Sequence, residues 1–292
     1  MKTLALLLLF AAPARGAETA AFLDLGIGAR ALALGGAYTA LGEDAHSLYW
    51  NPAGLAALKR REAAVSHAEL ALRTRHDFLA FAYPTERGTF AGGLTHLSHG
   101  ELEGRDALGR PTGGFEASDT AVSLAYAAKG GLADYGVAVK YIRGHIGSAE
   151  AQGVGLDAGL RRALGALTLG AALRNVGRGL KYDTERDDLP LRLAFGGAYR
   201  LTGGHALAAE LVNGPRGAGS VVSIGGEYQA LEAVFVRAGY TTRNVAGGSG
   251  FDAVRGLTLG MGFKNERWEL SYGVLPMGEL GNTHRFSLGS RF

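Results

Sequence analysis

Alternation of apolar residues with polar or very small ones, repeated in segments of about ten residues, constrains the fold of this chain most. The pattern runs from about residue 62 to the end. In the last segment, RFSLGSRF, one face is apolar and carries an aromatic ring at each end: Phe286, Leu288, Phe292. Side chains of a strand point alternately to its two faces. Such a strand suits a wall with lipid on one side and water on the other.

Fourteen segments have this period, and we predict strands near 61–68, 76–84, 88–98, 117–128, 134–143, 152–162, 166–176, 188–201, 205–213, 219–229, 233–241, 255–264, 267–275 and 283–292. Short turns alternate with longer loops at 99–116, 144–151, 177–187, 242–254 and 275–282. Bacterial outer-membrane barrels have an even number of strands, with short turns on the periplasmic side. We therefore expect both termini in the periplasm.

The fold class that we predict is all-β: a transmembrane antiparallel outer-membrane β-barrel of about 14 strands. A soluble β-sandwich would also alternate, but the aromatic residues near the strand ends and the Gly and Ala residues on the second face favour a barrel. Isolated charged residues also lie on that second face, and we expect them to be wall residues of a water-filled lumen rather than pairs across it: Lys140, Asp157, Arg161, Arg174, Arg192, Glu210, Glu227, Arg237, Lys264, Glu269 and Arg285.

The first 17 residues are typical of a signal peptide. Lys2 precedes an apolar run from Leu4 to Ala12, and small residues follow from Ala14 to Ala17. The run is shorter than the twenty or so apolar residues of a membrane-spanning helix. We predict export to the cell outer membrane of a Gram-negative envelope. Because the chain has no cysteine, neither a lipid anchor on Cys nor a disulfide is expected.

Composition indicates one ordinary folded domain after the signal. The 47 glycines among 292 residues exceed the usual share, but only 7 prolines accompany them and no linker divides the chain. The net charge is +3, and the Lys and Arg residues stand at scattered positions. A nucleic-acid surface needs a basic patch, so no nucleic acid is expected among the partners.

Residues 18–60 do not alternate. Leu34, Ala37, Tyr38 and Leu41 have helical spacing, and Gly42 is a natural stop. Asp44 starts a second short turn, and an Asn-Pro pair at 51–52 suits the cap and first residue of a third. We predict a helical plug, or hatch, at the periplasmic mouth (18–60), followed by the barrel (61–292). A dinucleotide loop at residues 26–28 is disfavoured because no strand precedes it and the third glycine is missing.

The run GARALALGGAYTALGEDAHSLYWNPAGLA resembles the amino-terminal signature of the PorV/PorQ family of outer-membrane proteins, which are relatives of the FadL fatty-acid and toluene transporters. Its Asn-Pro-Ala element is similar to that of the FadL hatch. The resemblance implies a fourteen-stranded barrel, and it implies that the following residues form the plug motif: Gly35, Gly36, Asp44, Trp50, Asn51, Pro52, Ala53 and Gly54.

The resemblance implies transport, or an accessory role in type IX-like protein secretion. The alternative is a FadL-like channel for uptake of hydrophobic small molecules, namely fatty acids or aromatic hydrocarbons. The short loops argue against a high-affinity fatty-acid site. The implied partners are outer-membrane lipid, the outer-membrane assembly machinery, and either secretion-system proteins or hydrophobic small molecules. We interpret Phe292 as the aromatic assembly signal.

No catalytic residue, cofactor or metal is predicted. Two histidines flank a serine, and two glutamates follow, near the end of a predicted strand: His96, Ser98, His99, Glu101 and Glu103. This spacing matches no hydrolase motif, and two histidines are too few ligands for a zinc site. An acidic loop is more consistent with solvation than with calcium binding; its residues are Asp183, Glu185, Asp187 and Asp188.

Overall fold

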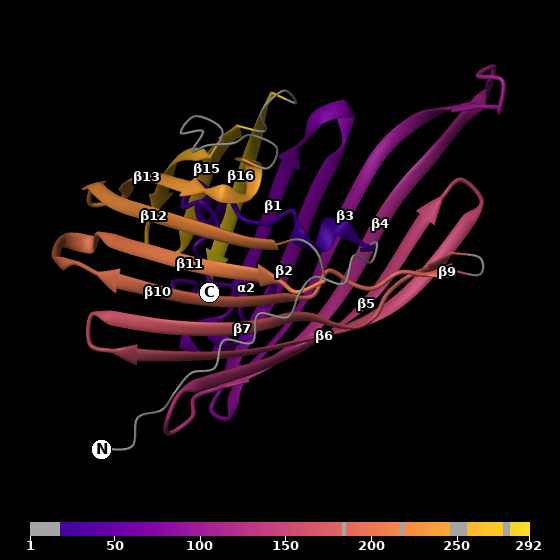
Figure 1. The fold of residues 1–292 in the computed structure, drawn as a ribbon. Helices are drawn as coiled ribbons and strands as arrows, with labels where there is room; N and C mark the ends of the chain where they lie inside the picture. The colour runs from indigo at the N-terminus through magenta and orange to yellow at the C-terminus, as the bar shows by residue number, and fades with distance from the viewer. Residues whose placement is uncertain (1–17, 183–184, 217–218, 246–255, 277–280) are drawn as a thin grey trace.

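The computed structural model is a closed barrel of fourteen antiparallel strands (Figure 1). It describes residues 18–182, 185–216, 219–245, 256–276 and 281–292. The predicted signal peptide therefore lies outside the described residues. The barrel strands are β1 (Glu62–Glu69), β2 (Arg75–Thr85), β3 (Gly88–Arg105), β4 (Pro111–Ala128), β5 (Asp134–Ile146), β6 (Ala149–Leu164), β7 (Leu167–Arg178), β10 (Arg192–Arg200), β11 (Ala206–Gly214), β12 (Gly219–Leu231), β13 (Val234–Thr241), β14 (Leu257–Lys264), β15 (Trp268–Pro276) and β16 (Asn282–Arg291).

The remaining elements are short. A separate hairpin consists of β8 (Lys181–Tyr182) and β9 (Glu185–Arg186). The helices are η1 (Ala21–Asp24), α1 (Ala29–Ala33), α2 (Ser47–Trp50), η2 (Pro52–Ala57), η3 (Ala71–Arg73), η4 (Thr202–Gly204) and η5 (Thr242–Val245). None of the helices in the described ranges has the length and apolar character needed to cross a bilayer.

The first and last strands close the barrel. β1 pairs with β16 in antiparallel register from Glu62 opposite Arg291 to Glu69 opposite His284. Beyond the strand, the backbone N–H of Phe292 donates to the carbonyl of Arg61 at 3.0 Å. Every barrel strand therefore has two hydrogen-bonded neighbours, as lipid requires. The fourteen-stranded antiparallel barrel predicted from the alternation is confirmed, and the sandwich alternative is wrong.

The predicted loop at 99–116 is wrong. β3 continues to Arg105, β4 begins at Pro111, and the two strands pair as a hairpin that projects beyond the neighbouring strands (Figure 1). Asp106 holds its turn, because Oδ1 accepts the backbone N–H groups of Leu108 and Arg110 at 2.9 Å. Alternation reveals a strand only when one face is apolar, and this projecting part is polar and exposed on both faces.

The connection between β7 and β10 also differs from prediction. The strand expected near 188–201 begins only at Arg192, and the expected loop at 177–187 contains the β8–β9 hairpin. Leu180 and Leu189 in this connection are fully buried. Thr19 donates its backbone N–H to the carbonyl of Asp188 at 2.9 Å. The connection therefore turns inward and meets the amino-terminal segment. Asp183 and parts of the other long loops lie outside the described residues.

The two faces of the wall have the predicted composition. Large apolar side chains face outward; Leu79 and Leu259, for example, are each 51% exposed. The inward positions hold Gly, Ala, hydroxyl and charged residues. Since the outer wall is apolar around the barrel, it is the face that contacts lipid.

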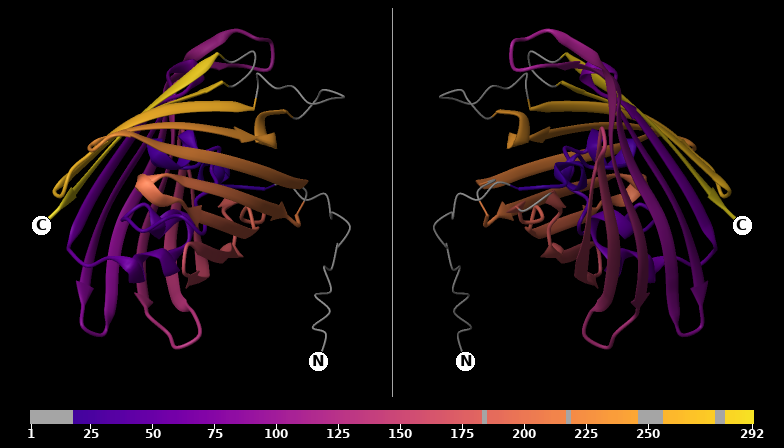
Figure 2. Two further views of the ribbon diagram at one scale, coloured as in Figure 1. Left: turned by 90° about the vertical axis from the view of Figure 1, so that its left-hand side faces the viewer. Right: turned by 90° about the vertical axis from the view of Figure 1, so that its right-hand side faces the viewer.

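The amino-terminal segment, residues 18–60, lies inside the barrel (Figure 2). α1 packs against β14 and β15, whereas η2 packs against β4, β5 and β6. We expected this segment at the short-turn mouth alone, with the amino terminus on that side. Instead Glu18, the first described residue, pairs with Asp188 in a long connection at the opposite end. The segment therefore follows the length of the interior, because its own apolar residues meet apolar side chains at both levels.

Candidate functional site

Glycines on the inner wall allow close approach of the amino-terminal backbone. A Cβ added at Gly239 would lie 2.3 Å from the backbone N of Gly35, and one at Gly170 would lie 2.5 Å from the carbonyl oxygen of Thr39. Such contacts require backbone movement. The same holds, with close backbone or side-chain neighbours in the segment, for Gly93, Gly136, Gly159, Gly225, Gly260 and Gly273. The small inward residues are therefore the contact surface for residues 18–60.

Gly35 and Gly36 form the turn after α1. Both have positive φ, 69° and 88°, which L residues with a side chain rarely adopt. The backbone N–H of Gly35 donates to Oγ1 of Thr258 at 3.1 Å. A Cβ on Gly35 would lie 2.6 Å from the carbonyl oxygen of Tyr240 in β13. Both backbone conformation and space therefore require glycine at position 35.

The Asn-Pro-Ala-Gly element caps η2 and joins it to the wall. Asn51 Oδ1 accepts the N–H of Ala53 at 3.0 Å, and Pro52 occupies the first helical turn, as the sequence predicted. Asn51 Nδ2 donates to the carbonyls of Thr39 at 2.8 Å and Leu160 at 3.1 Å. A Cβ on Gly54 would lie 2.5 Å from the carbonyl oxygen of Gly42. One side chain therefore links η2, the preceding loop and β6.

Asp44 organises a buried polar cluster beside α2. Tyr38 donates its hydroxyl to Oδ2 of Asp44 at 2.5 Å, and the backbone N–H of His46 donates to Oδ1 at 3.0 Å. Burial acts to raise the pKa of Asp44, but His46 and Arg30 outweigh it and hold that pKa well below its usual range. Burial acts to lower the pKa of His46, yet the Asp44 carboxylate raises it overall. Asp44 is therefore ionised.

Trp50 is buried between the segment and the wall. Its indole N–H donates to the carbonyl of Ile27 at 3.1 Å. The guanidinium of Arg174 lies 5.4 Å from the ring centroid, within range of a cation–π contact. Gly36 borders the ring, where a Cβ would lie 3.5 Å from it. Trp50 thus joins two predicted motif positions to β7.

Charged wall residues pair with the segment and with each other. Glu227 in β12 accepts from Arg30 at 2.7 and 2.8 Å and from Arg237 at 2.7 Å. Glu269 in β15 lies near the same arginines and 3.1 Å from Arg291. Arg237 is only 1% exposed. The expectation of a water-filled lumen is wrong for these groups, since residues 18–60 occupy the space that water would fill.

Further charged wall residues are equally buried. Lys140 pairs with Asp157 at 2.6 Å. Arg161 pairs with Glu43 and donates to the carbonyl of Ala40 at 3.1 Å. Glu210 accepts the backbone N–H groups of Tyr38 and Thr39, both at 2.8 Å. Pairing of this kind is what makes buried charge tolerable.

A second cluster closes the end with the long connections. Arg192 holds Glu18 through two bonds of 2.8 Å and Asp24 at 3.0 Å, while Arg243 holds Asp24 at 2.8 Å. Burial acts to raise the pKa of Asp24, but Arg243 and Arg192 lower it overall. Beside these pairs lies an apolar cluster that includes Phe22, Leu23, Leu97, Ile142, Leu180 and Leu189. Residues 18–25 are therefore anchored by both charge and packing.

A cavity of about 220 Å³ remains between the segment and the inner faces of β10 to β16. Leu25, Leu32 and Trp50 form part of its lining, and Arg285 and Glu210 supply charge. Arg285 donates to the carbonyls of Gly26 at 3.0 Å and Leu25 at 3.4 Å. The cavity therefore offers apolar contact together with hydrogen-bonding groups, as small-molecule sites commonly do.

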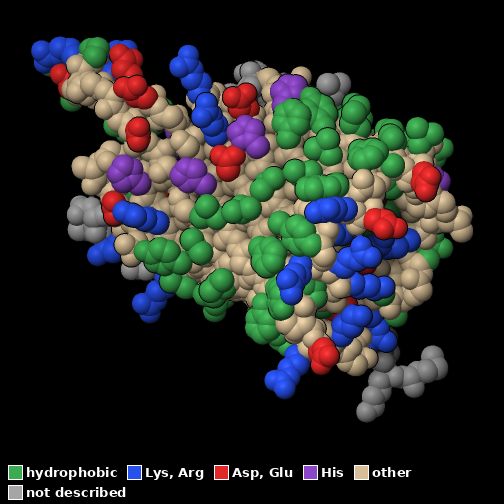
Figure 3. All heavy atoms as spheres, turned by 180° about the vertical axis from the view of Figure 1, so that it is seen from behind, with side chains coloured by type: hydrophobic (Ala, Val, Ile, Leu, Met, Phe, Trp, Pro, Cys, Tyr) green, Lys and Arg blue, Asp and Glu red, His purple; other side chains and the backbone are tan. Residues whose placement is uncertain are grey.

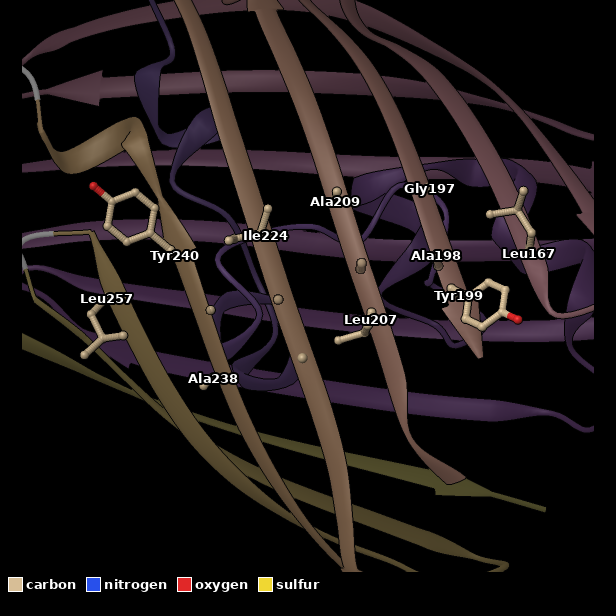
Figure 4. Close-up of a pocket in the computed structure, with 14 residues that line it drawn as sticks. Leu167, Gly197, Ala198, Tyr199, Leu207, Ala209, Ile224, Ala238, Tyr240 and Leu257 are labelled. Atoms are coloured by element: carbon tan, nitrogen blue, oxygen red, sulfur yellow. The ribbon is translucent and has the colours of Figure 1, made fainter. Parts of the chain in front are cut away.

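A separate groove of about 650 Å³ runs across the outer wall of β10 to β14 (Figure 4). Its rim includes Leu167, Tyr199, Ile224 and Leu257, all exposed. Directly behind it, Gly225 and Gly239 contact Leu34 and Gly35 of the segment. The wall is therefore thin there, but its strand pairing is continuous in register from β10 through β12 and across Ser223 to Gln229 of the β12–β13 pair.

The histidines weighed for catalysis do not come together with an acid and a nucleophile. His96 Nδ1 lies 2.9 Å from Oγ1 of Thr120, and His99 Nδ1 lies 3.2 Å from Oγ1 of Thr74. In the acidic connection, Asp188 pairs with Arg216 at 3.5 Å. Within the described ranges, no group of three or more His, Asp and Glu side chains is arranged to hold a metal ion.

This fold is that of the FadL-type outer-membrane channels. The chain is similar to the toluene transporter TodX of Pseudomonas putida, with 14% identity, a TM-score of 0.65 and coverage of 96% of this chain and 98% of that one. The toluene transporter TbuX of Ralstonia pickettii gives 15%, 0.65, 91% and 98%. A FadL homologue of Pseudomonas aeruginosa gives 13%, 0.58, 97% and 99%. These proteins are channels and not enzymes, and at this identity the likeness is one of fold.

Sequence comparison gives less. Residues 13–153 match the model of an uncharacterised protein family, UPF0164. No curated protein matches the chain.

Proposed function

We propose that the chain is a FadL-like outer-membrane channel for hydrophobic small molecules, with residues 18–60 acting as its plug. The observation that carries the proposal is the fold, shared over 96% of this chain with a toluene transporter and enclosing an amino-terminal segment. The apolar outer wall suits the outer membrane. A solute dissolved in the outer leaflet or the medium would reach the cavity beside Trp50 once the plug shifts.

The motif residues have the role of holding the plug in position. Gly35 and Gly36 allow the segment to touch β12 and β13; Asn51, Pro52, Ala53 and Gly54 join η2 to the wall; Asp44 and Trp50 organise the packing between them. In this proposal Phe292 directs assembly and residues 1–17 direct export. Lipid and the assembly machinery are then obligatory partners.

A PorV/PorQ-like secretion accessory is the second candidate. The signature run between Gly28 and Ala56 favours it, as does the dense packing of that run. A barrel that stays plugged while docking proteins needs such packing, whereas a channel needs it to yield. The two functions therefore differ in whether the cavity accepts a small solute.

Trp50 reports on the cavity directly. The chain has two tryptophans, and Trp268 lies exposed on the outer wall, so Trp268→Phe leaves Trp50 as the single emitter. Toluene and a long-chain fatty acid are titrated into this variant in detergent. A saturable change of Trp50 emission supports the channel. Linear change only, together with copurification of envelope proteins, would contradict the channel and favour the secretion role.

A further inference from the structure

The end of the barrel with the short turns carries a ring of exposed Lys and Arg residues. Going around the barrel, they lie before β1, in the β2–β3, β4–β5, β6–β7 and β10–β11 connections or the strand ends beside them, and before β15. The ring is Lys59, Arg60, Arg61, Arg87, Lys129, Arg162, Arg200 and Arg267. Exposed acids at this end, within the described residues, are Glu86, Glu232 and Glu266. Lys and Arg side chains gather at the end of the molecule opposite the projecting hairpin (Figure 3).

The ring cations are free to bind another molecule. Among the described residues, no carboxylate lies within the 4.0 Å of an ion pair from Arg60, Arg87, Lys129 or Arg162. The opposite end differs, because its exposed arginines are mostly neutralised within the chain. Arg105 pairs with Glu103 at 2.8 Å, Arg110 with Asp106 at 3.1 Å, and Arg143 with Glu150 at 2.5 Å. Unpaired positive charge is therefore concentrated at the short-turn end.

The height of the ring identifies its surroundings. Directly beside it, exposed aromatic side chains end the apolar band: Tyr83, Phe90, Tyr135, Tyr199, Tyr228, Phe263 and Trp268. Arg61 stacks 4.5 Å from the ring centroid of Tyr83, and Arg267 lies 5.6 Å from that of Trp268. Aromatic belts mark the level of lipid headgroups. The cations next to them therefore face headgroup phosphates all around the barrel.

We infer that this ring binds the phosphate headgroups of anionic phospholipids in the surrounding leaflet. Basic residues at the membrane surface attract anionic lipid, and the attraction decays over a Debye length. A soluble acidic protein would cover the mouth, but it would not reach a charge such as Arg162, which ends β6 on the outward, lipid-facing side with Leu160. The inference goes beyond transport and does not depend on what the barrel passes.

Spin-labelled lipids test the inference with the full-length protein reconstituted in phosphatidylcholine bilayers. The fraction of motionally restricted label gives the association of phosphatidylglycerol relative to phosphatidylcholine, averaged around the barrel. We expect a preference of about threefold or more at low ionic strength, reduced toward one in 0.5 M NaCl, because salt screens exposed charge.

Two matched variants locate the preference. The ring variant combines Arg60→Gln, Arg87→Gln, Lys129→Gln and Arg162→Gln. The control makes the same change of charge at the opposite end with Arg73→Gln, Arg75→Gln, Arg178→Gln and Lys181→Gln, which are also exposed. We expect the ring variant to lose the preference and the control to keep it, with both folded by circular dichroism. No preference in the unaltered protein, or equal loss in both variants, overturns the inference.

Discussion

Arg30 of the amino-terminal segment and Glu227 of β12 form a two-pronged ion pair inside the barrel, with bonds of 2.8 Å from Nε and 2.7 Å from Nη2. The pair joins residues 197 positions apart and is nearly buried. It links the segment to the side of the wall where Gly225 and Gly239 contact the backbone of the segment. Removing it therefore tests how firmly the segment is held.

Arg30→Met keeps much of the apolar stem and removes the charge. Arg237 still pairs with Glu227 at 2.7 Å, so the carboxylate is not left alone. We expect a loss of about 2–3 kcal/mol in the free energy of unfolding, from charged hydrogen bonds in a buried site. Denaturant unfolding measures this loss, and a double-mutant cycle with Glu227→Gln isolates the pair. Additive effects would show that the pair contributes no coupling.

Gly239→Ala is expected to displace the amino-terminal segment. The new Cβ would lie 2.3 Å from the backbone N of Gly35 and 2.4 Å from the carbonyl carbon of Leu34. Gly226→Ala is the matched control, because its Cβ would meet only Leu207 Cδ2 at 3.5 Å. We expect faster proteolysis within residues 18–60 and higher liposome permeability for Gly239→Ala alone. Equal behaviour of the two variants would contradict this role of Gly239.

Stability at alkaline pH is expected to depend on His46. Its pKa is raised in the folded protein because the Asp44 carboxylate outweighs the effect of burial. A raised pKa contributes stability that is fully present below the unfolded value of about 6.5 and is lost as pH rises through the folded pKa. The unfolding midpoint should therefore fall between pH 6 and pH 9, and His46→Gln should reduce this fall. His145→Gln, a half-buried histidine with a similar sequence change, should leave it unaltered.

Leu259→Arg tests the lipid-facing wall. Leu259 is 51% exposed on β14 between Leu257 and Met261, so the charge would enter the apolar band. We expect a cost of about 2–4 kcal/mol in the free energy of unfolding from lipid. Leu108→Arg, in the tip of the projecting hairpin and 75% exposed, should cost almost nothing. A comparable cost in both would indicate that Leu259 does not face lipid.

Phe292→Ala is expected to lower the amount of protein in the outer membrane without weakening the folded barrel. The side chain is 57% exposed, whereas the backbone N–H to Arg61 survives the substitution. Quantitative blotting of membrane fractions measures the first effect and heat-induced unfolding the second. Phe195→Ala, at an outward position 52% exposed, is the control. Normal membrane levels of Phe292→Ala would count against an assembly signal.

The wall could be predicted from the sequence, but much of the interior could not. Outward residues such as Leu79 and Leu259 alternate with inward ones because lipid and protein lie on opposite sides of each strand, and that period is local. Pairs such as Arg30 with Glu227 or Asn51 with Leu160 join distant parts of the chain. No local pattern records such a pair.

Two local signals were nevertheless informative about the interior. The Asn51-Pro52 cap was recognisable because a cap is made within three residues. The inward glycines indicated either a narrow or an occupied lumen, and the contacts of Gly170 and Gly239 show which. The buried state of Arg237 or Glu210 could not be inferred, because it depends on which segment covers them.

The β1–β16 seam fixes an order of events in folding. β16 supplies the last pairing that closes the wall, and the segment that precedes β1 contacts the inner face of nearly every part of the barrel. A closed wall has no gap wide enough for folded helices to enter from the side. Residues 18–60 must therefore be enclosed while the sheet is still open, so that the chain wraps itself around its own beginning and the final strand seals it in.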